Sequence, residues 1–78
     1  MSTRKRRGGR AKPYAVRTRG PLATDVWSRP LRRRSEEGAR TLMGQVRARV
    51  YDDVRVRLTG PEGVVLGSAM GTKTRPVG

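Results

Sequence analysis

The chain has 78 residues, of which 19 are Lys or Arg and only six are Asp or Glu, so its formal net charge is +13. It contains no cysteine and no histidine, which excludes disulfides, thiol nucleophiles and the commonest metal ligand. Because no apolar run approaches the roughly 18 residues of a membrane span, we expect no membrane contact. The expected location is cytoplasmic, on the nucleoid or inside a particle.

Most of the positive charge lies in the first half of the chain. Residues 1–34 carry twelve basic groups and one acid, whereas residues 35–78 carry seven basic and five acidic groups. A GC-rich gene accounts for the excess of Arg over Lys, but it does not account for the scarcity of acids. The charge therefore indicates an anionic partner.

The first twelve residues, MSTRKRRGGRAK, hold six basic groups and no acid. They have too few apolar side chains to order themselves, so residues 1–12 are predicted to be a disordered basic arm. Such an arm either follows a phosphate backbone or is a solvated or targeting tail. The candidate nucleic-acid contacts in the arm are Arg4, Lys5, Arg6, Arg7, Arg10 and Lys12.

Residues 13–19 (PYAVRTR) form the first predicted element, a short strand. Tyr14 and Val16 lie on one side of it, with Arg17 and Arg19 opposite. The Gly-Pro pair that follows ends the strand.

Residues 24–28 (TDVWS) favour one helical turn, with Thr24 as its cap and Asp25 in the first turn. Trp27 is either a core anchor or, like Tyr14, a platform on which a base stacks. The aromatic content of 4% is low for a protein that binds single strands. It favours a duplex bound through its backbone.

Three arginines, Arg32, Arg33 and Arg34, stand directly before Ser35, a good helix N-cap. The free N–H groups and the dipole at a helix start favour an anion, and the guanidinium groups strengthen that preference. The pattern predicts phosphate contact here, and the alternative is a plain loop.

The strongest helical pattern covers residues 35–51. Glu36 and Arg40 form a favourable i,i+4 pair, and Arg47 lies near the edge of an apolar stripe. That stripe consists of Ala39, Leu42, Met43, Val46 and Val50. An alternative pairs residues 46–50 (VRARV) as a strand with the segment that follows, because alternation fits that arrangement too.

Residues 54–59 (VRVRLT) alternate with period two, which predicts a strand. A four-residue GPEG connection leads to a second strand at residues 63–69, completing a hairpin. Its apolar face holds Val54, Val56 and Leu58. Arg55 and Arg57 point outward, where either an anionic partner or plain solvent meets them.

The order of these elements predicts one α+β domain over residues 13–70, followed by a flexible tail at 71–78. The main helix packs on the C-terminal hairpin, with a short N-terminal strand. One outline is winged-helix-like, with the hairpin as the wing, and the other is a sheet with the helix across three strands. A domain this small is marginal, so a homodimer or a bound polyanion is expected to supply stability.

The residues offer no catalytic group, metal set or phosphate loop. We expect no enzyme, no cofactor and no small-molecule substrate. The expected function is nucleic-acid binding, with DNA favoured over RNA, by a bacterial or phage accessory or regulatory factor. Alternatives are a ribosomal-type or virion assembly protein and a binder of an acidic protein. The candidate contacts in the domain are Arg17, Arg19, Arg32, Arg33, Arg34, Arg47, Arg55 and Arg57.

Overall fold

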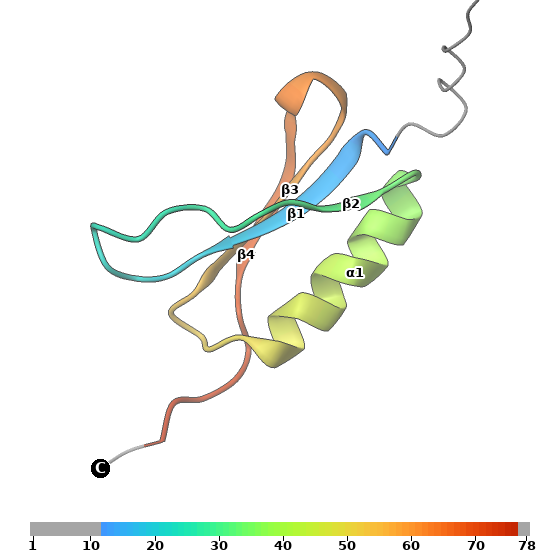
Figure 1. Ribbon diagram of the computed structural model, residues 1–78. Coiled ribbons are helices and arrows are strands. Elements are labelled where there is room, and N and C mark those ends of the chain that lie inside the picture. The colour runs from blue at the N-terminus through green and yellow to red at the C-terminus, as the bar shows by residue number, and fades with distance from the viewer. Residues whose placement is uncertain (1–11, 77–78) are drawn as a thin grey trace, which may run out of the picture.

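The computed structural model describes residues 12–76, which form a four-stranded antiparallel sheet with one α-helix across one face (Figure 1). The strand order is β2-β1-β3-β4. The α+β class predicted from the sequence is therefore confirmed. The elements are β1 (Tyr14–Arg19), β2 (Leu31–Arg33), α1 (Glu36–Arg49), β3 (Arg55–Thr59), the 3-10 turn η2 (Pro61–Gly63) and β4 (Val65–Met70).

The sheet is larger than the predicted hairpin with one accessory strand. β1 lies inside the sheet, between β2 and β3. β2 is built from residues for which no strand was predicted: Leu31, Arg32 and Arg33 pair with the first half of β1. The winged-helix outline is not confirmed, because residues 12–76 hold a single α-helix and the hairpin is an integral part of the sheet. The predicted arm lies outside the described residues, except for Lys12.

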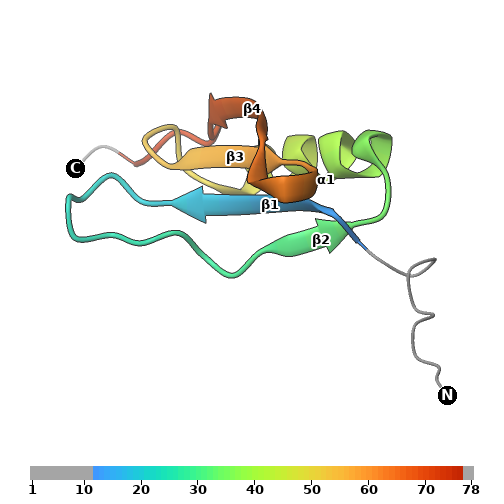
Figure 2. The same cartoon turned by 90° about the horizontal axis from the view of Figure 1, so that it is seen from above.

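The connection between β1 and β2 is extended, so the helical turn predicted at residues 24–28 is wrong. A tight turn is closed by the N–H of Asp25, which donates to the carbonyl of Leu22. Further on, the Ser28 N–H donates to the Thr18 carbonyl at 2.8 Å, and the Thr18 N–H donates to the Ser28 Oγ at 3.0 Å. These bonds hold the returning chain beside β1, and the loop projects past the end of the sheet (Figure 2).

Helix α1 begins where the sequence predicts, because the Ser35 Oγ accepts a hydrogen bond from the Gly38 N–H at 3.0 Å. The predicted ion pair between Glu36 and Arg40 is present at 2.6 Å. Since both side chains are about half exposed, the pair contributes only about 0.3–0.5 kcal/mol. The helix continues to Arg49, so the strand alternative for residues 46–50 is wrong.

The core lies between α1 and the face of the sheet formed by β1 and β3. Val16, Val56 and Leu58 are fully buried there and pack against Ala39 and Leu42 of the predicted helical stripe. Burial of each such aliphatic side chain contributes about 1.5–3 kcal/mol. The residues that pack against this core while only partly buried are Tyr14, Met43, Val46, Val50 and Leu66.

The chain beyond β4 is tied to the end of α1. The Thr72 N–H donates to the Arg47 carbonyl at 2.8 Å, and the Lys73 N–H donates to the Val50 carbonyl at 3.0 Å. Gly71 is buried, and a Cβ on it would meet the backbone oxygens of the residues that follow the helix. Residues 71–78 were predicted to be a flexible tail, but Thr72 and Lys73 are hydrogen-bonded to the end of the helix.

Candidate nucleic-acid interface

The face of the sheet turned away from α1 carries arginines from three strands. The register places Arg17 of β1 directly opposite Arg57 of β3, and Arg19 directly opposite Arg55. Their sequence neighbours face the helix, so strand alternation sends these side chains to the other side. β2 adds Arg32, which pairs with Ala15 on the same side. We call this surface the arginine face, made of Arg17, Arg19, Arg32, Arg55 and Arg57.

In residues 12–76, no carboxylate forms an ion pair with an arginine of this face. Within residues 12–76, the ion pairs join Glu36 to Arg40 and Asp53 to Arg75, and none involves the arginine face. Cβ atoms of directly opposite residues are about 4.5–5.5 Å apart, and like charges in such positions are destabilising. Two successive Arg–Arg pairs thus hold positive charge together at a cost to stability.

Trp27 lies on the arginine face, so its interpretation as a core anchor is wrong. The guanidinium carbon of Arg57 stands 3.9 Å from the centroid of the indole ring. Because Arg57 points away from α1, the ring that it contacts must lie on the same side of the sheet. A cation–π contact at a partly exposed site is worth about 0.5–1 kcal/mol. Tyr14, the other candidate for base stacking, packs against the core instead.

Two guanidinium nitrogens of the face are buried without a partner. These are the Nε atoms of Arg17 and Arg57, which make no hydrogen bond with any part of the described chain. A buried donor left unpaired costs free energy, and more so when it is charged. Both positively charged groups are therefore positioned by the fold and still have hydrogen-bonding capacity to spare.

Arg19 differs from the other arginines of the face because its side chain donates hydrogen bonds to the backbone of its own chain. Its Nε donates to the carbonyl of Asp25 at 2.9 Å, which ties β1 to the loop beyond it. Asp53 lines a hollow of about 190 Å³ at this end of the face, together with Arg19 and Arg55. The carboxylate of Asp53 forms its ion pair with Arg75 and none with Arg19 or Arg55.

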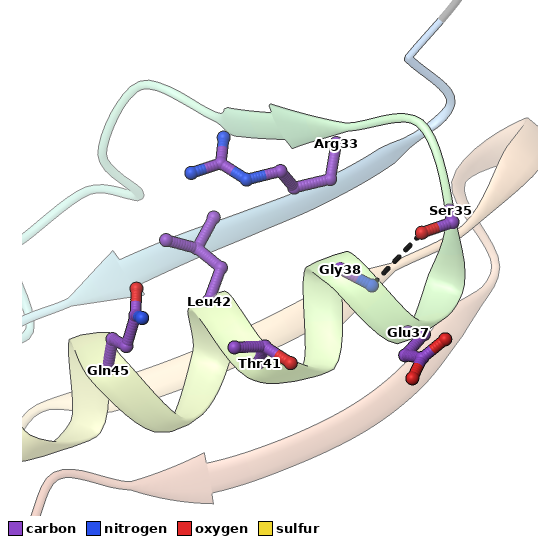
Figure 3. A pocket seen from close by; sticks show the side chains of 7 residues that line it. All are labelled: Arg33, Ser35, Glu37, Gly38, Thr41, Leu42 and Gln45. Atoms are coloured by element: carbon purple, nitrogen blue, oxygen red, sulfur yellow. Dashed lines mark hydrogen bonds between the residues drawn. The ribbon is translucent and has the colours of Figure 1, made fainter.

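The arginines before Ser35 lie near the start of α1, as the sequence predicts. Arg33 reaches over Leu42 of the helix and lines a groove of about 490 Å³ (Figure 3). Arg34 lies beside it in an adjacent hollow of about 420 Å³, together with Lys12 and Arg32. Since Arg32 also belongs to the arginine face, this hollow links the helix start to the edge of that face.

Arg47 is not brought to the arginine face. It lies on α1, on the other side of the sheet, and its Nε donates to the Met70 carbonyl at 2.8 Å. Its own carbonyl accepts from Thr72. The contacts of Arg47 therefore fasten the chain after β4 to the helix. Five predicted contacts, Arg4, Lys5, Arg6, Arg7 and Arg10, lie outside the described residues.

Residues 12–76 contain neither a candidate metal site nor a membrane-spanning helix. Within residues 12–76, the Asp and Glu side chains form no group of three or more that could hold a metal ion. Across the same residues, α1 falls short of the length and apolar character that a membrane-crossing helix needs.

No family model matches the chain, and comparisons with curated proteins and with solved structures found no similar protein.

Proposed function

We propose that the chain is a small non-enzymatic nucleic-acid-binding protein that contacts the phosphate backbone through its arginine face. The observation that carries this proposal is the pair of cross-strand contacts, Arg17 opposite Arg57 and Arg19 opposite Arg55, with no ion pair to a carboxylate in residues 12–76. A bound polyanion converts this repulsion into attraction, because guanidinium groups make charge-assisted hydrogen bonds with phosphates.

The alternative for these arginines is the solvated side of a small sheet. A solvated surface normally mixes charges of both signs, and a sheet gains from pairing opposite charges across strands. Here four cations face one another in the central two strands. The sequence alternation explains why these side chains are polar, but it does not explain why they all have one sign.

The layout of the cations favours an extended anion. Arginines two residues apart on a strand are separated by about 6.6–6.8 Å, from a rise of about 3.3–3.4 Å per residue. A nucleic-acid strand likewise presents its negative charges in a regular row. The predicted basic arm adds cations to this array.

A duplex is favoured over a single strand, with DNA as the first candidate. Proteins that bind single strands stack successive bases on several aromatic rings. The chain contains one Trp, two Tyr and no Phe, and of the described rings Trp27 lies on the arginine face with Arg57 against it. Backbone contacts position a protein without reading sequence. An accessory or regulatory factor of a bacterium or phage is the expected setting.

The test measures binding of the full chain to a labelled 15-base-pair DNA duplex across a range of salt concentrations. If six to ten phosphates are neutralised, the logarithm of the affinity falls with the logarithm of salt at a slope of roughly −5 to −9. A flat response overturns the proposal. Preferential binding to polyglutamate at equal charge concentration instead supports a partner that is an acidic protein.

Two double variants locate the interface. Arg17→Gln with Arg55→Gln removes two charges from the arginine face, and Arg40→Gln with Arg49→Gln removes two charges from α1. The face variant is expected to make the salt slope shallower by about 2, at about 0.9 per phosphate contact. The helix variant is expected to keep the slope. Equal weakening by both variants contradicts the placement of the interface on the sheet.

A further inference from the structure

One end of the arginine face contains a hollow of about 390 Å³, between β2, β1 and the turn η2. Its lining includes Ala15, whose side chain is small and only 4% exposed. Ala15 pairs with Arg32 of β2 on one side and with Thr59 of β3 on the other. Arg17 lies two residues further along β1, on the same face. Three side chains that can donate hydrogen bonds therefore surround the methyl group of Ala15.

The register brings the two arginines within reach of one small anion. Arg32 and Arg17 are diagonal neighbours, because Arg32 pairs with Ala15 and Arg17 follows two residues later. Diagonal neighbours in a sheet are about 7–8 Å apart, which long side chains span. Arg17, Arg32 and Thr59 all line the hollow. A tetrahedral anion between them receives donors from three strands.

One hydrogen-bond donor of Arg17 also lacks an acceptor. Its Nε is buried and has no hydrogen-bond partner among residues 12–76. A charged donor in that position is costly unless an acceptor pairs with it. The acid that lines the hollow is Glu62 of η2, which is exposed and forms no ion pair with either arginine. Within residues 12–76, neither Glu62 nor another acceptor pairs with the Arg17 Nε.

We propose that this hollow binds a single phosphate group, held by Arg17 and Arg32. The Thr59 hydroxyl, whose hydrogen bond to the Ala15 carbonyl is long at 3.5 Å, turns to the phosphate as a third donor. The inference rests on the proposed function and deepens it, because it assigns one fixed phosphate position within a broader backbone contact. The phosphate is either an internal phosphodiester of the bound duplex or a terminal phosphate at its 5′ end. In both cases this contact sets the register of the nucleic acid on the face.

The experiment follows the Nε–Hε NMR signals of the arginines in the full-length, ¹⁵N-labelled chain. The probes are inorganic phosphate, a 15-base-pair duplex with 5′-phosphates and the same duplex with 5′-hydroxyls, each compared with chloride at matched ionic strength. We expect the Arg17 signal to shift and saturate with inorganic phosphate and with the phosphorylated duplex. A shift with the 5′-hydroxyl duplex identifies an internal phosphate, and its absence identifies a terminal one.

Two variants separate the hollow from general charge. Ala15→Leu fills it without changing any charge, and Thr59→Val removes the hydroxyl while keeping the side chain's shape. Both are expected to weaken inorganic phosphate binding several-fold, and the second keeps the test valid if Ala15→Leu does not fold. Arg49→Gln, which removes a charge from α1, outside both the hollow and the arginine face, is the control and is expected to leave the Arg17 response in place.

The possible failures are distinguishable. Duplex binding without an Arg17 response overturns the phosphate position and leaves the proposed function standing. A saturable Arg17 response to inorganic phosphate without duplex binding overturns the proposed function, and the hollow then serves a phosphate of another source. A response that chloride reproduces, or that persists unchanged in both Ala15→Leu and Thr59→Val, reflects ionic strength alone and overturns the site.

Discussion

Replacing Arg55 with glutamine should stabilise the fold and at the same time weaken nucleic-acid binding. Arg55 is exposed, lies directly opposite Arg19 and has no ion pair within residues 12–76. Removing one member of a directly opposed like-charge pair relieves about 0.2–1 kcal/mol of repulsion. In a domain of this size 1 kcal/mol corresponds to about 4–8 °C. The melting temperature should therefore rise by about 1–8 °C at low salt.

The same substitution removes one phosphate contact from the proposed interface. The salt slope of duplex binding should become shallower by about 0.9. The matched control is Arg49→Gln, which removes one charge from the exposed last turn of α1. That change should lower stability by about 0.3–1 kcal/mol, because a cation there complements the helix dipole, and it should leave duplex binding nearly unchanged.

The assay is thermal unfolding followed by circular dichroism, at about 10 mM and about 1 M salt. Screening shortens the Debye length from about 30 Å to about 3 Å over that range, so the gain from Arg55→Gln should shrink at high salt. A lower melting temperature than the parent at low salt would refute the reasoning that this face is under electrostatic strain. Unchanged duplex affinity would place Arg55 outside the interface.

Four further substitutions, one of them a control, test the packing and the ion pair between Asp53 and Arg75. Leu58→Ala should lower the free energy of unfolding by about 2–5 kcal/mol in urea, because Leu58 is fully buried; a loss under 1 kcal/mol would contradict the core assignment. Gly71→Ala should cost about 1–3 kcal/mol, since a Cβ there meets backbone oxygens that cannot move freely. Its control, Gly44→Ala, has open space around the Cβ and should stabilise α1 by about 1 kcal/mol. A hydrogen bond from Arg75 holds the pKa of the Asp53 carboxyl below its ordinary value. The ion pair therefore stabilises the fold at a pH above the ordinary pKa of a carboxyl group. That stabilisation is lost as the pH falls through the lowered pKa. A carboxyl NMR titration should show the low pKa in the parent and a return toward the ordinary value when the arginine is replaced by glutamine.

Local patterns in the sequence were sufficient to predict α1 and the strand β3. The Ser35 cap and the i,i+4 pair between Glu36 and Arg40 act within one turn of helix, so they do not depend on the rest of the fold. The alternation of residues 54–59 likewise assigns Arg55 to one face and Val56 to the other. Both predictions use interactions between residues close in sequence, which is why they could be made without a structure.

β2 and the chain before it could not be predicted in this way. A strand of three residues has no periodicity to detect, and Leu31–Arg33 is extended because β1 offers it a partner. The position of Trp27 depends on the bonds between Thr18 and Ser28, and on Arg57, 30 positions further along the chain. Contacts at such separations belong to the tertiary structure.

The sequence by itself determined that the chain is strongly basic and that Arg55 and Arg57 share one side of a strand. Only the tertiary structure decided that Arg17 and Arg19 would stand directly opposite them. The reason is the antiparallel register between β1 and β3, in which Val16 pairs with Leu58 beneath the helix. Burial of that apolar pair selects the register, and the register in turn assembles separate arginines into one surface.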